Sequence, residues 1–209
     1  FISGLSTRAL PTITNFSSFS KTIALNNVER FLFGLMSPIY KIDPSLGIFN
    51  LTHSFHFLGF LRGEMRDIEW RVKYFDEKFR SELPNVFNHF KALDLSTEIF
   101  LLPWLLTLFS VYFPLEMTLR IWDNFLLEKE IYVYKIALGI LKYFELELRL
   151  STFDNACNML KKAQNDFDEG LFFDTVEKLS ISLLEFESCI SNQRIAHVNA
   201  EIHMATFFR

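Results

Sequence analysis

The feature that most constrains this chain is a run of 17 residues without a charged side chain, from Ile99 to Leu115. A transmembrane helix needs roughly 20 consecutive apolar residues, so the run is marginal in length for a span. Proline interrupts it at Pro103 and Pro114, and no cluster of basic residues marks either flank. We therefore predict two buried helices of a soluble domain, with an integral membrane protein as the alternative.

The composition predicts an all-α fold. Half of the 209 residues are hydrophobic and 25 are Phe, whereas only 7 Gly and 6 Pro interrupt the chain. Such a chain is short of turn residues and long enough to bury a sizeable core without metals or disulfides. Its net charge of −4 offers no basic surface for a phosphate backbone, so we expect no nucleic-acid partner.

Few residues suggest a metal or redox site, and we expect no cofactor. His53 and His56 are three residues apart, but no neighbouring Cys or carboxylate set completes a metal site. Cys157 and Cys189 lie in helix-like surroundings and are expected to be reduced, buried thiols, although a single disulfide between them stays open.

Apolar residues recur every three or four positions over most of the chain, which is typical of amphipathic helices. The pattern predicts helices over about 26–37, on either side of Gly63, after Pro84, and over about 97–109, 114–127, 130–148, 153–164 and 171–198. Residues 6–25 are rich in Ser and Thr and are expected to be a polar insertion or loop. No strand and no internal repeat is predicted.

The helix expected over 114–127 carries two apolar rows and one polar strip, so we predict that it is buried on two sides. The rows are Leu115, Leu119, Trp122 and Leu126, and Met117, Ile121 and Phe125; the strip is Glu116, Arg120, Asp123 and Asn124. The strip has two interpretations. It is an intrahelical ion-pair ladder of small energy, or Arg120 or Asp123 reaches a neighbouring loop and holds it.

The stretch WLLTLFSVYFPLEMTLRIWDNFLLE, followed by YVYKIALGILKYFELELRL, resembles the C-terminal signature of TBC domains, the helical GTPase-activating domains for Rab-family small GTPases. The signature positions are Trp104, Leu108, Phe109, Leu119, Arg120, Trp122 and Asp123, and the resemblance implies structural roles for them. It implies a multi-helix array of orthogonal and antiparallel helices. Residues 1–190 would be the C-terminal part of the domain and 191–209 a terminal helix or tail.

The family implies two catalytic fingers, an Arg in Ile-x-x-Asp-x-x-Arg and a Gln in Tyr-x-Gln, which act beside the nucleotide of a GTP-bound Rab. Neither motif is present: Gln164 and Gln193 lack the Tyr. The pairs Asp67/Arg71 and Asp76/Arg80 have the wrong spacing, so we expect them on an exposed helical face. We assign no catalytic residue in this chain.

The first residues, FISGL, resemble the segment that follows the glutamine motif in the family, so the fingers are expected upstream of Phe1. The resemblance implies a cytoplasmic regulator of membrane traffic that accelerates GTP hydrolysis by a Rab and reaches endomembranes through its partners. The alternative is a non-catalytic helical module that binds a small GTPase or another protein.

Overall fold

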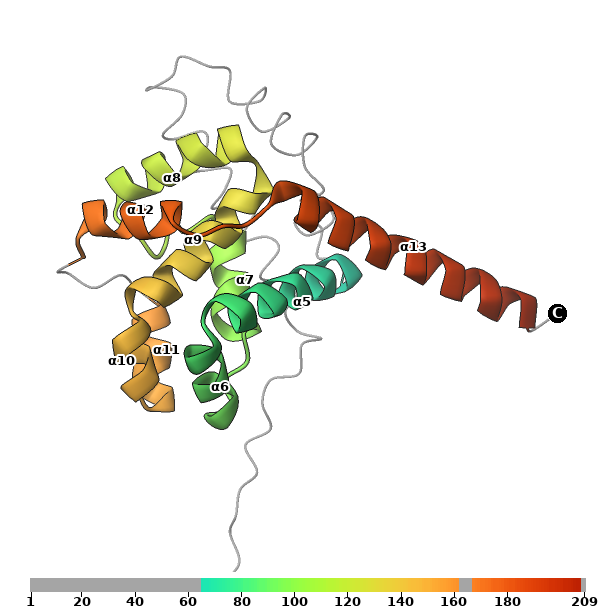
Figure 1. Ribbon diagram of the computed structural model, residues 1–209, viewed down its shortest axis with the longest axis horizontal. Helices are drawn as coiled ribbons and strands as arrows, with labels where there is room; N and C mark the ends of the chain where they lie inside the picture. Colours follow the sequence, from blue (N-terminus) through green and yellow to red (C-terminus); the bar gives the residue numbers. More distant parts are fainter. Residues whose placement is uncertain (1–64, 162–166, 208–209) are drawn as a thin grey trace, which may run out of the picture.

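The computed structural model describes residues 65–161 and 167–207, and its helices are shown in Figure 1. They are α5 (Met65–Glu82), α6 (Pro84–Ala92), α7 (Glu98–Thr107), α8 (Leu115–Glu128), α9 (Glu130–Tyr143), α10 (Glu145–Leu150), α11 (Phe153–Lys161), α12 (Glu169–Glu177) and α13 (Leu183–Phe207). Within these two ranges there is no strand, which confirms the all-α prediction. The helices and insertion expected before Met65, with His53 and His56, lie outside the described residues, as does Gln164.

The single helix predicted over 130–148 is two helices. Phe144 leaves helical geometry (φ −97°, ψ 21°) and separates α9 from α10. The apolar spacing continues through the break, because Phe144 and Leu148 are both buried. The turn redirects the chain so that α10 packs against α6 as well as against α9. No Gly or Pro marks this position, so the sequence pattern does not reveal the break.

The helix predicted over 171–198 is likewise two helices, α12 and α13, joined by residues 178–182. Leu179 and Ile181 in the joint are buried, which preserves an apolar pattern through it. α12 lies along α9 and α13 along α5, as Figure 1 shows. A single straight helix could not follow both surfaces. At the other end of α12, the Asp168 side chain caps the helix by accepting a hydrogen bond from the Leu171 amide (2.9 Å).

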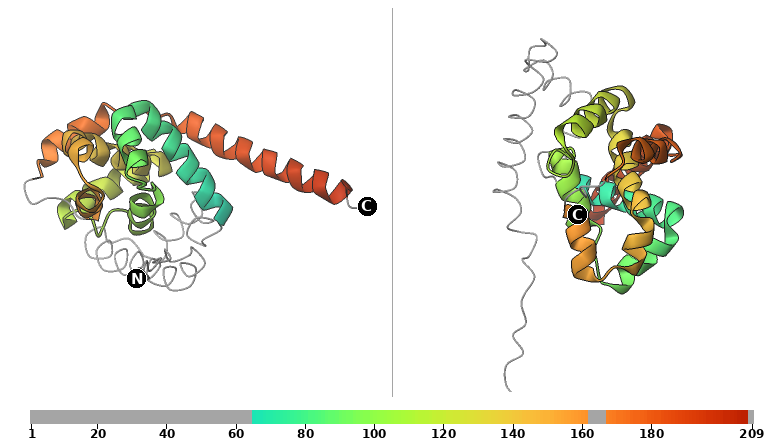
Figure 2. Two further views of the ribbon diagram at one scale, coloured as in Figure 1. Left: turned by 90° about the horizontal axis from the view of Figure 1, so that it is seen from below. Right: turned by 90° about the vertical axis from the view of Figure 1, so that its left-hand side faces the viewer.

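α9 is the central helix of the described fold. It contacts α7, α8, α10 and α12, and Figure 2 shows the packed helices from two further directions. Eleven of its fourteen residues are buried. Of its two lysines, Lys142 is exposed, whereas Lys135 is half-buried and binds Glu128 (2.5 Å). The core of the molecule is thus built around α9.

Gly139 allows α12 to lie against α9. A β-carbon at this position would stand 2.5 Å from Cγ2 of Val176, which is itself buried. We expect Gly139→Ala to lower the free energy of unfolding by about 1–2 kcal/mol, because overpacking outweighs the better helix propensity of alanine. Urea denaturation followed by circular dichroism measures this loss. A stabilised variant would show that α12 shifts without cost.

α8 is buried on one side only, so the prediction of two buried sides is wrong. Met117, Ile121, Trp122 and Phe125 face the core together with Thr118. Leu115 and Leu126, from the other predicted row, are 48% and 44% exposed. The apolar row was misleading because leucines at a helix surface have the same spacing as core leucines.

No helix in the described ranges is both long and apolar enough to cross a membrane. The apolar run instead forms α7, the turn after it and the start of α8, with Phe100, Leu101, Leu105 and Phe109 buried. Two helices are expected from this run and two are found, α7 and α8, each with buried residues on one side. Cys157 and Cys189 are free thiols, and both are half-buried rather than buried.

Burial of tyrosines predicts alkaline unfolding. Burial, with the charge of Glu128, raises the pKa of Tyr132 to about 12, and burial also raises the pKa of Tyr74, Tyr112 and Tyr134. An unfolded tyrosine ionises near pH ~10, so between about 10 and 12 the unfolded chain holds fewer protons and the free energy of unfolding falls as pH rises. Tyr132 alone contributes roughly 2 kcal/mol to this loss. Phenolate absorbance that shows all six tyrosines ionised near pH ~10, with circular dichroism unchanged, would contradict it.

Candidate functional site

The signature residues surround a strained turn between α7 and α8. Leu108 ends α7 with φ 44° and ψ 46°, and Phe109 follows with φ 63°. Each left-handed residue of this kind costs roughly 1–2 kcal/mol, because its Cβ approaches a carbonyl oxygen. Both side chains are buried, so packing offsets the strain. The turn sends the chain back over the core and sets the direction of α8.

Two buried tryptophans bind backbone carbonyls around this turn. The Trp122 indole Nε1 donates to the carbonyl of Leu108 (3.1 Å), and the Trp104 Nε1 donates to the carbonyl of Leu160 in α11 (3.0 Å). The Phe109 amide donates in turn to the Trp104 carbonyl (3.0 Å). Carbonyls at the end of a helix lack intrahelical donors, and these bonds supply them. Trp104 and Trp122 therefore connect α7, α8 and α11.

Arg120 connects α8 to α12. Its guanidinium Nη1 lies 3.3 Å from Oε1 of Glu169, and its Cζ lies 3.9 Å from the ring centroid of Phe173. This supports the second interpretation of the polar strip, in which Arg120 reaches another element. The element is the first turn of α12 rather than a loop. Arg120 thus stacks on the buried ring of Phe173 and pairs with a carboxylate of the same helix.

We expect Arg120→Ala to lower the free energy of unfolding by about 1 kcal/mol, because an exposed ion pair and a cation–π contact each contribute about 0.5–1 kcal/mol. Arg120→Lys should recover only part, since an ammonium group lacks the planar surface that stacks on Phe173. A double-mutant cycle with Glu169→Gln, at low and high salt, separates the two contacts. If the cycle shows no coupling energy between Arg120 and Glu169 at low salt, their ion pair does not contribute to stability.

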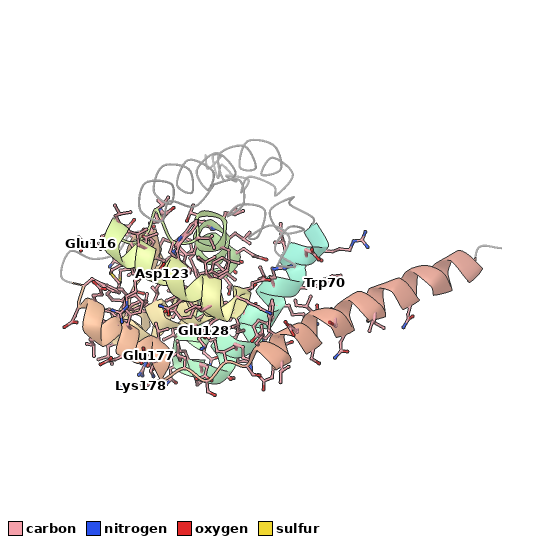
Figure 3. All side chains as sticks on the ribbon, turned by 90° about the horizontal axis from the view of Figure 1, so that it is seen from above. Trp70, Glu116, Asp123, Glu128, Glu177 and Lys178 are labelled. Carbon is pink, nitrogen blue, oxygen red and sulfur yellow. The ribbon has the colours of Figure 1, made fainter. Side chains whose placement is uncertain are left out.

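The outer face of α8 is the accessible part of the signature. Glu116 and Asp123 are exposed on it, Leu119 is half-buried, and Leu127 is 80% exposed. Figure 3 shows Glu116, Asp123 and Glu128 spread along this helix, with Glu177 at the nearby end of α12. Acidic groups beside exposed leucines can bind a protein surface.

The structure corrects the expectation that Asp67 and Arg71 form an exposed helical face. Both are buried, and Arg71 is fully so. Its Nε lies 2.5 Å from Oε1 of Glu130 and its Nη2 lies 3.2 Å from Oε2, so the pair is bidentate. Nη1 donates to the Asp67 carbonyl (3.1 Å), and the Tyr134 hydroxyl donates to Oε1 of Glu130 (3.1 Å).

This buried cluster was missed because its two charged partners are 59 residues apart in sequence. Burial alone would lower the pKa of the Arg71 guanidinium, but the Glu130 carboxylate opposes this and the net pKa is raised. The ion pair ties α5 to the start of α9. A fully buried arginine cannot enter a partner's nucleotide site, so Arg71 is not a finger in this arrangement.

Asp76, Arg80 and Gln193, the other residues compared with the finger motifs, also have contacts within the fold. Asp76 is half-buried and accepts a hydrogen bond from the Thr97 hydroxyl (2.5 Å). Arg80 is exposed, as expected, and lies over the ring of Phe87 (4.9 Å to its centroid). Gln193 donates to Sγ of Cys189 within α13 (3.3 Å). Among the residues that the structure describes, no three His, Cys, Asp or Glu side chains are grouped to hold a metal ion.

Comparisons with known proteins agree on one family. The family of the Rab-GTPase-TBC domain matches residues 39–149. Drainin from Dictyostelium discoideum is 30% identical over 151 residues, which are 72% of this chain and 34% of Drainin. TBC1 domain family member 14 from Mus musculus is 34% identical over 107 residues (51% of this chain, 15% of that protein). TBC1 domain family member 12 from Xenopus tropicalis is 29% identical over 150 residues (70% and 22%).

The chain thus spans about a third of Drainin and less of the other two relatives. The family match covers α5 to α9 and nearly all of α10, and it includes the turn that Trp104 and Trp122 hold. The signature residues lie in this region, although Leu160 and Glu169, which Trp104 and Arg120 contact, lie after it. The chain therefore belongs to the Rab-GTPase-TBC domain family.

Proposed function

We propose that this chain is the C-terminal part of a domain that accelerates GTP hydrolysis by a GTP-bound Rab. The observation that carries the proposal is the family match over 39–149, which includes most of the described helices. The residues present would act as scaffold and as part of the surface that contacts the GTPase. The Arg and Gln fingers would come from elsewhere in the parent protein, and Trp104, Leu108, Phe109, Leu119, Arg120, Trp122 and Asp123 would have structural roles.

In this proposal residues 1–190 belong to the activating domain, 6–25 are an insertion, and 191–209 are a terminal helix. α13 runs through position 190 without a break, so the terminal helix would continue directly from the domain. The parent would act in the cytoplasm in vesicle traffic and reach endomembranes through its partners.

The test is single-turnover GTP hydrolysis by a panel of Rabs with the full-length parent protein. An arginine finger supplied by a partner accelerates hydrolysis by roughly 10³–10⁵-fold, and we expect a gain of this order for the correct Rab. The 209-residue chain alone should give no acceleration, because it lacks both finger motifs. A parent that binds a Rab without accelerating hydrolysis would overturn the proposal.

That outcome would favour the second candidate function, a non-catalytic module that binds a small GTPase. The observation that favours it is the outer face of α8, where exposed leucines lie beside Glu116. Glu116→Arg should weaken Rab binding under either function if this face contacts the GTPase. Glu147→Arg, which makes the same charge change at an exposed position of α10, is the matched control. If both variants bind the Rab with equal affinity, the outer face of α8 is not part of the contact surface.

A further inference from the structure

Three aromatic rings meet where the start of α13 lies against the other helices. The ring of Phe186 contacts those of Tyr74 in α5 and Tyr134 in α9, with centroids 4.9 and 5.3 Å away. The two tyrosine rings lie 5.6 Å from each other, and all three side chains are buried. The start of α13 therefore covers aromatic side chains that belong to two other helices.

The hydroxyl of Tyr74 is buried in this cluster without a hydrogen bond. Within the described residues, its oxygen has no hydrogen-bond partner. Burial raises the pKa of this hydroxyl, and the charges of Glu185 and Cys189 raise it further, so these two α13 side chains lie near the oxygen. A buried polar group without a partner loses the hydrogen bonds that it would make to water, which is unfavourable. Release of α13 would let water reach the hydroxyl and would remove this cost.

The contacts that hold α13 in place lie near its N-terminal end. Among its side chains that the structure describes, those of Phe186 and Ile190 are buried, whereas eleven of the fourteen residues of α9 are buried. Lys78 binds Glu185 (2.5 Å), but Glu185 is exposed, and exposed ion pairs contribute little to stability. Figures 1 and 2 show α13 extending away from the other helices toward its C-terminal end. Elements with few buried apolar side chains open most readily, so α13 is expected to open before α9.

The segment between α12 and α13 is suited to act as a hinge. Residues 179–182 are not helical, and hinges are typically a few residues between elements that absorb changes in φ and ψ. Leu179 and Ile181 are buried and belong to the hydrophobic core. These two anchors would keep the segment and α12 in place while α13 moves away from α5.

We propose that the start of α13 is a releasable clasp, which opens at residues 179–182 while the other helices stay folded and uncovers the rings of Tyr74 and Tyr134. The unpaired hydroxyl of Tyr74 favours the open state, and burial of Phe186 and Ile190 favours the closed state. The open state would expose an aromatic surface that the closed state buries. This conformational change does not depend on the activity of the parent protein toward a Rab.

Hydrogen exchange of the 209-residue chain, followed by mass spectrometry, tests whether α13 opens by itself. Amides of residues 186–190 should exchange at least about tenfold faster than those of residues 136–141 in α9, since only the α9 amides require unfolding of the core. Trp122→Phe weakens the turn between α7 and α8, so it should speed exchange in α9 by roughly tenfold and leave exchange in α13 unchanged. Equal acceleration in both helices, or equal rates in the parent chain, would mean that α13 opens only when the whole domain unfolds, and would overturn the proposal.

Removal of the Tyr74 hydroxyl tests whether opening uncovers this group. Tyr74→Phe keeps the ring and removes the unpaired oxygen, so it should stabilise the closed state and slow exchange at residues 186–190 by roughly tenfold. Tyr112→Phe is the matched control, because the buried Tyr112 donates its hydroxyl proton to the Met159 carbonyl (3.3 Å) and its loss should not slow exchange in α13. Circular dichroism checks that each variant is folded. Exchange in α13 that Tyr74→Phe fails to slow, or that both variants slow equally, overturns the proposal.

Discussion

Glu130→Leu is expected to lower the free energy of unfolding by about 3–5 kcal/mol, because it leaves the buried Arg71 guanidinium without its carboxylate. Arg71 is fully buried and forms two hydrogen bonds to Glu130. Tyr134 loses the acceptor for its hydroxyl in the same variant. Guanidinium denaturation of the chain followed by circular dichroism measures the loss.

The double variant Arg71→Met with Glu130→Leu separates the charge from the packing. Replacing both members of a buried ion pair by apolar side chains is often neutral or stabilising, so it should recover most of the loss. Glu130→Gln is the matched control, since it keeps the shape of the side chain and removes only its charge. If the Glu130→Leu variant is as stable as the parent chain, water must reach the Arg71 guanidinium.

Trp122→Ala is expected to lower the free energy of unfolding by about 3–5 kcal/mol, because it removes a large buried side chain beside the turn. Trp122 is 4% exposed and its indole N–H binds the carbonyl of Leu108. Without this bond, the left-handed turn at Leu108 and Phe109 loses one of the contacts that offset its strain. Thermal and urea unfolding measure the change.

Trp122→Phe isolates the hydrogen bond from the ring. It keeps an aromatic side chain in the core and leaves the Leu108 carbonyl without its donor, so we expect a loss of about 1–2 kcal/mol. A Phe variant as stable as the parent chain, together with a destabilised Ala variant, would assign the whole effect to packing.

Several features of the fold and candidate site were predictable from sequence because they depend on local spacing. The all-α class, the pair of helices in the apolar run and the family signature all follow from residues close together in the chain. The absence of both finger motifs is also a local property of the sequence. The resemblance also implied structural roles for Trp104 and Trp122, but not that Leu160 and Leu108 supply the carbonyls that they bind.

The features that sequence missed depend on contacts between distant segments. The breaks at Phe144 and at residues 178–182 interrupt no apolar period, because buried side chains continue through both. The helical spacing around Arg71 predicts an exposed face, but α5 packs beside the start of α9, where Glu130 binds Arg71. Likewise, nothing in the spacing of Leu115 and Leu126 distinguishes a second core row from surface leucines.

The sequence by itself determined that the chain is helical, that its apolar run folds as helices of the domain, and to which family its signature is similar. Helical period and turn chemistry are properties of short segments, so they can be read without coordinates. Only the tertiary structure decided that Arg71 is buried, that Arg120 reaches Glu169, and that α13 leaves the body after Ile190. These outcomes depend on which surfaces meet, because burial and charge pairing are set by neighbours that are distant along the chain.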